Sequence, residues 1–165
     1  MTESLIPPEA LAMIGKETGR QTGVVYKKEF QRWAAAVNDL NPLYFDEEFA
    51  KAQGYRDVVM PPLFLSQVMG GVMRLENLRP DGIPGGRGRG TDIPLKPQRR
   101  VAGGEETEYY EPVYPGDVLN SVSKLAVLEE KEGRSGPFVL ITRETTYTNQ
   151  DGVVVALGRG STIAR

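Results

Sequence analysis

The segment PPLFLSQVMGGVM, residues 61–73, decides the predicted fold. Its proline pair suits the first turn of a helix, where a missing N–H group breaks no helical hydrogen bond. The apolar side chains that follow lie on nearly every side of such a helix: Leu63, Phe64, Leu65, Val68, Met69, Val72 and Met73. Because a helix of this kind must be covered all round, the segment predicts a buried helix wrapped by other structure.

Upstream of this segment, the pattern predicts one strand and two shorter helices. Residues 21–26 are a candidate strand. A helix is predicted next by apolar residues at i, i+3, i+4 and i+7, namely Phe30, Trp33, Ala34 and Val37. Pro42 ends that helix, because proline disfavours helical geometry in the residue before it. Asp46 is a candidate N-cap for a second helix over residues 47–53.

Downstream, the composition becomes β-rich. Residues 79–104 are dense in glycine and proline and predict a long loop. Four candidate strands follow, at 105–113, 118–129, 138–149 and 153–163. In the third of them, Val139, Ile141 and Tyr147 share one face. We therefore predict a single α+β domain over residues 1–165, with an antiparallel sheet packed on a central helix.

Composition limits the classes of function. The chain has 165 residues, of which 39% are apolar and 25% charged, and its formal net charge is −2. Without a broad basic field, we expect no binding to nucleic acid or to a membrane. Histidine and cysteine are both absent, so neither a zinc site nor thiolate chemistry is expected. The N-terminus has no basic lead and no long apolar run, so a cytoplasmic protein is the default expectation.

The stretch NDLNPLYFDE, residues 38–47, is the candidate for acid–base chemistry. It places the carboxylate of Asp39, the amide of Asn41 and the phenol of Tyr44 close together in the chain. Each of them also has a purely structural interpretation, because Asp39 can end a helix, Asn41 can shape a turn and Tyr44 can pack in the core. Composition and spacing alone leave both interpretations open.

Three stretches carry a family resemblance: AAAVNDLNPLYFDEEFAKAQGYRDVVMPPLFL (34–65), GGEETEYYEPVYPGD (103–117) and KEGRSGPFVLITRETTYTNQDG (131–152). They resemble the MaoC-like hydratase/dehydratase superfamily, and more narrowly the N-terminal half of fatty-acid-synthase-type dehydratases. The resemblance implies a hot-dog fold, in which an antiparallel sheet wraps around a long central helix. It also implies hydration or dehydration of an acyl thioester, carried on coenzyme A or acyl carrier protein, with no further cofactor.

The family's catalytic pattern is only half present. Active members carry Asp-x-Asn-Pro-x-His and then a His-Gly pair at the start of the central helix. Asp39, Asn41 and Pro42 match this pattern, whereas Tyr44 stands in place of the first histidine. A phenol with a pKa of about 10 is only about 0.1% ionised at pH 7, so Tyr44 can donate a hydrogen bond but is a poor base.

The second half of the pattern is replaced by residues 61–62, the proline pair, which has no N–H group to offer an oxyanion. The N–H groups of Leu63 and Phe64 remain as candidate donors, because first-turn N–H groups have no helical partner. The resemblance thus implies Asp39 and Tyr44 as the catalytic candidates. The candidates for binding the acyl thioester are Asn41, Pro62, Leu63 and Phe64, and the local excess of positive charge adds Arg87 and Arg89. The two arginines lie in a basic stretch suited to coenzyme A phosphates or an acidic carrier, or they belong to a solvated flap.

Three functions remain open at this point. The favoured one is a subunit that lacks the catalytic dyad, shapes the tunnel for the acyl tail and supports a histidine-bearing MaoC-like partner in a heterodimer. The second is a self-sufficient homodimeric hydratase, with Asp39 as a base strengthened by burial and Tyr44 as a donor. The third is an acyl-thioester binding module without turnover.

Overall fold

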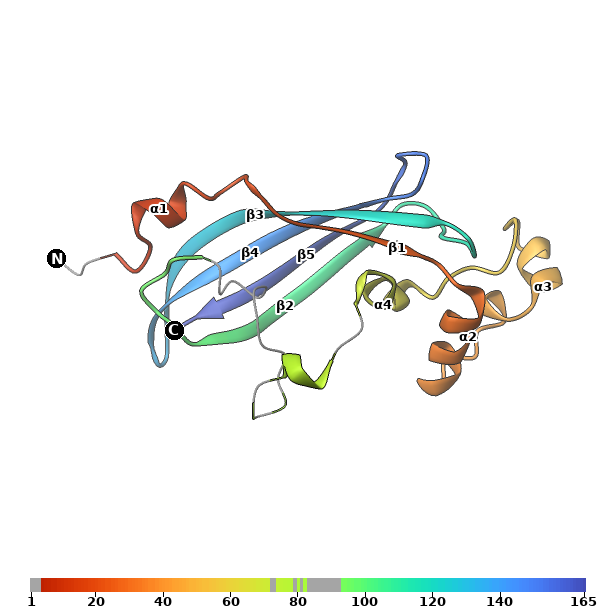
Figure 1. The fold of residues 1–165 in the computed structure, drawn as a ribbon, viewed down its shortest axis with the longest axis horizontal. Coiled ribbons are helices and arrows are strands. Elements are labelled where there is room, and N and C mark those ends of the chain that lie inside the picture. The colour runs from red at the N-terminus through yellow and green to blue at the C-terminus, as the bar shows by residue number, and fades with distance from the viewer. Residues whose placement is uncertain (1–3, 72–73, 79, 81, 83–92) are drawn as a thin grey trace.

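The computed structural model describes residues 4–71, 74–78, 80, 82 and 93–165. Within these residues the strands form one antiparallel sheet in the order β1-β3-β4-β5-β2, so β1 and β2 are its two edges (Figure 1). The strands are β1 (Glu17–Val24), β2 (Arg100–Tyr109), β3 (Val118–Gly133), β4 (Gly136–Thr148) and β5 (Val154–Ala164). The three last strands confirm the sequence prediction to within a few residues.

The first strand of the β-rich half begins earlier than predicted. β2 starts at Arg100, so the prediction of a loop through residue 104 is wrong at its C-terminal end. A register shift between Ala102 and Glu105 accommodates the two intervening glycines, and a Cβ on Gly103 would lie 2.3 Å from Ser161 Oγ. Glycine at a bulge of this kind does not break a strand, and for that reason glycine density was a poor guide here.

The helices within the described residues are all short. They are α1 (Pro8–Leu11), α2 (Lys27–Ala36), η1 (Pro42–Tyr44), α3 (Glu47–Ala52), η2 (Pro62–Phe64), α4 (Leu65–Met69) and η3 (Leu75–Asn77), where η denotes a 3₁₀ helix. The predicted stripe of α2 is confirmed at Phe30 and Ala34, which are fully buried, but not at Val37, which is 53% exposed and forms the C-cap. The predicted cap of α3 is confirmed, because the Asp46 carboxylate accepts hydrogen bonds from two first-turn N–H groups, both at 3.0 Å.

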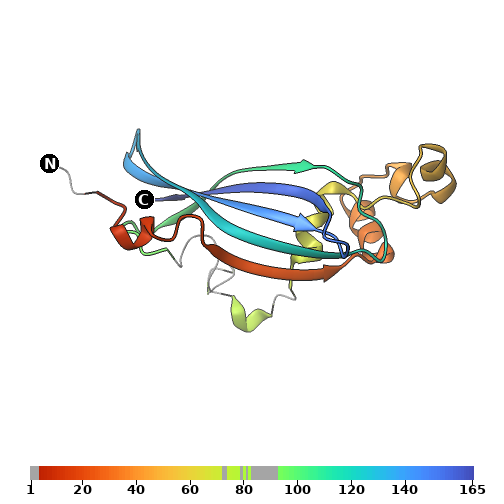
Figure 2. The ribbon, with the colours of Figure 1, turned by 90° about the horizontal axis from the view of Figure 1, so that it is seen from above.

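The prediction of a long central helix is wrong. A 3₁₀ turn, η2, leads into α4, which ends at Met69, and Gly70 adopts an extended conformation with ψ of 131°. Two consecutive glycines, Gly70 and Gly71, explain the stop, since glycine loses the most backbone entropy in a helix. α4 packs closely on the edge strand β1, because a Cβ on Gly23 would lie 2.1 Å from the backbone oxygen of Val68. Figure 2 shows α4 at one end of the curved sheet.

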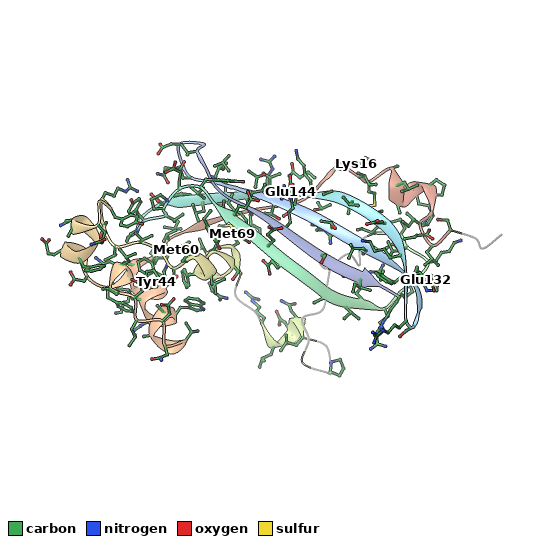
Figure 3. All side chains as sticks on the ribbon, turned by 180° about the vertical axis from the view of Figure 1, so that it is seen from behind. Lys16, Tyr44, Met60, Met69, Glu132 and Glu144 are labelled. Atoms are coloured by element: carbon green, nitrogen blue, oxygen red, sulfur yellow. The ribbon has the colours of Figure 1, made fainter. Side chains whose placement is uncertain are left out.

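Two separate apolar clusters cover the inner face of the sheet, one at each end. The first gathers α2, η1, η2 and α4 against the sheet and includes Tyr44, Met60 and Met69, which Figure 3 labels at that end of the molecule. The second gathers α1 and the segment around Ile93 against Val139. Figure 1 shows α1 and α2 at opposite ends of the sheet. In the part of the chain that the structure describes, no helix has the length and apolar character needed to cross a membrane.

Candidate functional site

The end of α2 sets the position of Asp39. Asn38 adopts a left-handed conformation with φ of 59°, its N–H donates to the Ala35 carbonyl at 3.2 Å, and the Asp39 N–H donates to the Ala34 carbonyl at 2.9 Å. These two bonds form a Schellman motif, a common way to end a helix. Asp39 therefore directly follows the helix end, with its side chain exposed to solvent. The Asp39 side chain therefore lacks the burial that the homodimeric-hydratase alternative invoked.

The 3₁₀ turn η1 brings three of the predicted residues together. Asn41 caps it, because its side-chain oxygen accepts a hydrogen bond from the Leu43 N–H at 3.0 Å. Tyr44 is 8% exposed and belongs to the first apolar cluster. Burial raises the pKa of the Tyr44 phenol, the negative charge of Asp39 and a side-chain hydrogen bond with it raise the pKa further, and an Asn41 hydrogen bond opposes the shift. Asn41 thus shapes a turn and Tyr44 packs in the core, as their structural interpretations predicted. Both residues also lie next to Asp39.

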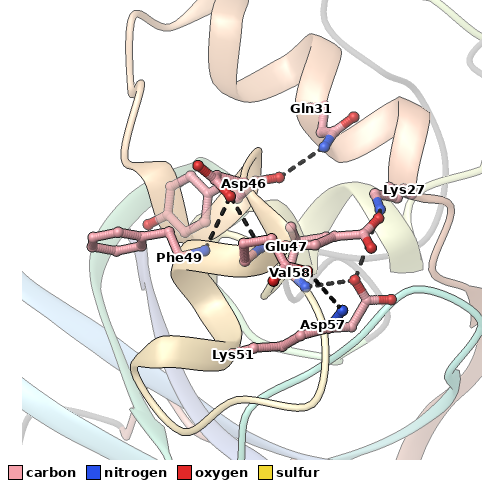
Figure 4. A network of polar contacts seen from close by, with 10 residues as sticks. Lys27, Gln31, Asp46, Glu47, Phe49, Lys51, Asp57 and Val58 are labelled. Atoms are coloured by element: carbon pink, nitrogen blue, oxygen red, sulfur yellow. Dashed lines mark hydrogen bonds and ion pairs between the residues drawn. The ribbon is translucent and has the colours of Figure 1, made fainter.

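A polar network fixes η1 and α3 against α2 (Figure 4). Gln31 on α2 donates through Nε2 to the backbone carbonyl of Tyr44 at 2.9 Å. Lys27, one turn earlier, forms an ion pair with Glu47 on α3 and lies 3.7 Å from a carboxylate oxygen of Asp57. These contacts hold the Asp39–Tyr44 loop in one geometry, although each exposed ion pair alone contributes little stability.

A cavity of about 300 Å³ lies elsewhere, between the start of the central helical segment and the inner face of the sheet. Its helical wall is formed by Pro62, Leu63, Leu65 and Ser66, and its sheet wall by Glu105, Thr107, Tyr109 and Tyr147. Neither Asp39 nor Tyr44 is among its lining residues. A volume of about 300 Å³ is at the lower end of the range for ligand pockets.

The predicted residues at the start of the central helical segment therefore lie in different places. Pro62 and Leu63 line the cavity, and Leu63 is 74% exposed. Phe64 points instead into the first apolar cluster, where its ring lies 5.8 Å from that of Trp33. The Phe64 N–H donates to the Pro61 carbonyl at 2.9 Å, whereas the Leu63 N–H has no backbone partner among the described residues, and the role of either group as an oxyanion donor stays a prediction. Arg87 and Arg89 lie outside the described residues.

Sequence reasoning missed the sheet wall of the cavity. Glu105, Thr107 and Tyr109 alternate along β2 and therefore share its inner face. This alternation was visible in the sequence, but only the strand register shows that Tyr147 of β4 lies on the same face, two strands away. The Tyr109 hydroxyl donates to the Pro62 carbonyl at 2.7 Å and so ties β2 to η2.

The two tyrosines of this wall have raised pKa values, mainly because they are partly buried. Burial raises the pKa of both Tyr109 and Tyr147, and the negative charge of Glu105 contributes to each shift. Both phenols are therefore neutral hydrogen-bonding groups near pH 7. No group of three or more acidic side chains suited to a metal ion occurs in the described part of the chain.

The family of the chain is shown by its similarity to known proteins. Residues 12–157 match the family described as "FAS1-like, dehydratase domain region". The chain belongs to this family. A solved structure described as a "MaoC-like dehydratase" shares the fold, with a TM-score of 0.68 and 22% identity over 94% of this chain and 43% of that chain, as the sequence resemblance predicted.

Relatives and solved structures agree with that assignment. The FAS1-like dehydratase domain is 33% identical to a UPF0336 protein of Parafrankia sp. (strain EAN1pec) over 141 residues, 86% of this chain and 83% of that protein. It is 32% identical over 133 residues, 78% of this chain, to a "Probable enoyl-CoA hydratase alpha subunit" of Thermomonospora curvata, of which it spans 41%.

Two Mycobacterium tuberculosis structures share the fold. A chain of the ChsH1–ChsH2 complex aligns with a TM-score of 0.73 and 21% identity, covering 94% of each chain. A chain of the HadBC (3R-hydroxyacyl-ACP dehydratase) complex aligns with a TM-score of 0.62 and 19% identity, covering 88% of this chain and 95% of that one. The five-stranded antiparallel sheet is therefore that of a hot-dog fold, built here without the long central helix.

Proposed function

We propose that this FAS1-like dehydratase domain is the dyad-lacking subunit of an acyl-thioester hydratase or dehydratase. In this role it forms part of the acyl-binding tunnel and supports a partner that carries the Asp/His dyad. The observation that carries the proposal is the state of the proton-transfer site. The chain has no histidine, and the residue in its place, Tyr44, is a buried phenol whose pKa is raised.

Proton transfer near neutral pH requires a group whose pKa lies near the working pH. A phenol with a pKa raised above its ordinary value of about 10 holds its proton more tightly still and does not accept one from water. The proline pair that opens η2 removes two of the backbone donors that an oxyanion needs. Both deficits act against unaided turnover.

The acyl-binding part of the proposal is supported by the truncated central helix. α4 has five residues, and the cavity beside it is bounded by an apolar helical wall. Apolar side chains in a concave site favour the methylene chain of an acyl group, which gains about 0.8 kcal/mol for each buried CH₂. The need for a partner is supported by the two sheet edges, β1 and β2, because edge strands present unpaired backbone groups.

The test uses the full chain, alone and with a histidine-bearing MaoC-like subunit. We expect no measurable hydration of short or long enoyl thioesters by the chain alone, turnover when the partner is added, and a heterodimer by native mass spectrometry. Asp39→Asn should leave the turnover of the complex largely intact. Efficient turnover by the chain alone, lost in Asp39→Asn, would overturn the proposal.

That last outcome would favour a second candidate, a homodimeric hydratase in which Asp39 and Tyr44 handle the water. One observation supports it, namely that the Asp39 carboxylate lies close enough to the Tyr44 phenol to raise its pKa. Tyr44→Phe distinguishes the two functions. It should abolish turnover in a self-sufficient enzyme, and it should leave the turnover of a heterodimer within a few-fold of the unmodified complex.

A further inference from the structure

A second pocket lies at the end of the edge strand β2. It has a volume of about 230 Å³ and is formed where residues 55–62 meet residues 109–113. The Met60 N–H donates to the Val113 carbonyl at 2.8 Å, and the side chains of both residues are buried, so the pocket has an apolar base that is held in place. The pocket adjoins the cavity beside α4, with which it shares two lining residues.

The polar side chains of this pocket offer mainly acceptors. Two of its three tyrosines have already used their hydroxyl hydrogens: Tyr109 donates to the Pro62 carbonyl and Tyr110 donates to a carboxylate oxygen of Glu108, both at 2.7 Å. Because a phenol has one O–H hydrogen, only the lone pairs of these two oxygens remain for a bound group. Among the described residues that line the pocket, Glu111 is the one that is charged, and its exposed carboxylate has no ion-pair or hydrogen-bond partner in the described part of the chain.

Such a lining suits the side chain of an arginine. A guanidinium group has five N–H donors and no acceptor, and its methylene stem packs on apolar surface while the charged end meets the acceptors. A phosphate or carboxylate would instead meet the negative charge of Glu111. The chain already binds one of its own arginines nearby with the same chemistry, because the Arg56 guanidinium lies 4.2 Å from the centre of the Tyr114 ring and 2.7 Å from a carboxylate oxygen of Asp117.

The size and position of the pocket favour a side chain of a second protein over a free small molecule. Its volume of about 230 Å³ is below the usual range for ligand pockets, about 300–1,000 Å³. β2 is an edge strand that ends at Tyr109, so the pocket directly continues an edge along which a partner can pair. Tyrosine and arginine are also among the residues that contribute most to the affinity of protein interfaces.

We propose that this pocket binds an arginine side chain of the partner subunit, with Glu111 as its ion-pair partner and the phenol oxygens of Tyr109 and Tyr110 as further acceptors. The inference rests on the proposed function and specifies the partner as a subunit that presents an exposed arginine close to the edge of its own sheet. Lysine fits less well, because its compact and strongly hydrated ammonium group lacks the planar fork of donors that several acceptors can share.

The first test measures binding of two small probes to the full chain by NMR chemical shifts. The probes are N-acetyl-arginine amide and N-acetyl-citrulline amide, which have nearly the same shape but differ in charge. We expect saturable shifts of the backbone amides of Tyr55, Tyr110 and Glu111, and binding of the arginine probe that is about three- to tenfold tighter than that of the citrulline probe. That factor is what one charge-assisted hydrogen bond gives at a site that is open to solvent.

Two variants and two matched controls assign the effect to the pocket. Glu111→Gln should remove the preference for the arginine probe, and Tyr110→Phe should reduce it, because the ring stays and one acceptor oxygen is lost. The controls are Glu29→Gln and Tyr26→Phe, an exposed carboxylate and an exposed phenol at the start of α2, and both should keep the preference unchanged. Because the preference is a ratio of two affinities measured on one protein sample, partial misfolding of a variant does not change it.

The second test measures the affinity of the full chain for a histidine-bearing MaoC-like subunit. Glu111→Gln should raise the dissociation constant of the heterodimer about three- to tenfold, and Glu29→Gln should leave it unchanged. Equal binding of the two probes, or an active heterodimer whose affinity Glu111→Gln does not alter, would overturn the arginine pocket and leave the proposed function standing. If no heterodimer forms, the proposed function is overturned, and the probe preference alone then upholds or overturns the arginine pocket.

Discussion

Replacing Asp117 with asparagine is expected to destabilise the fold by several kcal/mol, because this buried carboxylate joins three segments. Asp117 is 5% exposed. Its Oδ1 accepts hydrogen bonds from Arg56 Nη2 at 2.7 Å and from Gln150 Nε2 at 3.4 Å, and its Oδ2 accepts from the Tyr114 N–H at 2.8 Å. The Arg56 guanidinium also lies 4.2 Å from the centre of the Tyr114 ring. The turn that contains Tyr114 and Asp117 therefore binds Arg56 through a cation–π contact as well as an ion pair.

The magnitude follows from what asparagine can replace. It keeps the volume but offers one acceptor oxygen, so it cannot serve both Arg56 and the Tyr114 N–H. Losing a hydrogen bond between charged groups costs about 1.5–3 kcal/mol, and leaving a buried donor unpaired costs about 1–3 kcal/mol. Since Arg56 is 63% exposed, solvent screens part of the ion pair, and we expect about 2–4 kcal/mol in total. Arg56→Gln should cost less, about 1–2 kcal/mol, because Asp117 keeps its other two donors.

Urea unfolding, followed by circular dichroism, measures these differences. The two single variants and the double variant form a cycle whose coupling energy should be about 1 kcal/mol or more, as for residues in one hydrogen-bonded network. Glu111→Gln, an exposed carboxylate nearby, is the matched control and should change the free energy of unfolding by less than about 0.5 kcal/mol. A loss as small as that control for Asp117→Asn would refute the assignment of Asp117 as a structural junction.

Three further predictions concern elements around the candidate site. Asp46→Ala should lower the free energy of unfolding by about 1 kcal/mol, because two first-turn N–H groups of α3 lose their cap, and urea unfolding would contradict this by showing no change. Gly23→Ala should lower the free energy of unfolding by about 1–3 kcal/mol, because the new Cβ would collide with Val68. Gly19→Ala on the same strand places its Cβ in open space and should be near neutral. Equal effects of the two variants would refute the close packing of α4 on β1. The raised pKa of Tyr44 contributes stability that is fully present below the unfolded pKa of about 10 and is lost as the pH rises through the folded pKa. Tyr44→Phe should therefore flatten the decline of the unfolding free energy at alkaline pH. An unchanged slope would argue against the pKa shift.

The elements that local sequence signals determine were predictable. The Asp46 cap, the apolar stripe at Phe30 and Ala34, and the alternation in β4 each depend on residues close in the chain, and the structure confirms them. Val37 was mispredicted because an αL residue at Asn38 ends the helix one position earlier, and no single-residue rule distinguishes that asparagine from a helical one.

The candidate site was only partly predictable for a different reason. The loop around Tyr44 is continuous in sequence, so its three polar residues were identified together, although none of them lines the cavity. The cavity instead combines η2 with strands β2 and β4, whose register is a tertiary property. Sequence spacing predicts which residues of β2 share a face, but not which residue of another strand lies opposite.

The polar residues on the inner face of the sheet account for both the polar wall of the cavity and the early end of the helix. The sequence of the strands therefore predicted the length of the helix better than the sequence of the helix did. A long central helix would have to lie over Glu105, Thr145 and the glycines of β5, which share the inner face between the two apolar clusters. Covering the charged side chains of Glu105 and Arg143, which share this face, with an apolar helix would take both out of water at a cost of several kcal/mol, and the glycines would leave unfilled space beneath the helix. The apolar run of residues 61–73 describes what the helix could bury, whereas the alternating residues of β2, β4 and β5 limit where it can lie. The inner-face residues of a predicted sheet therefore indicate how far a central helix extends better than the hydrophobicity of the helix itself does.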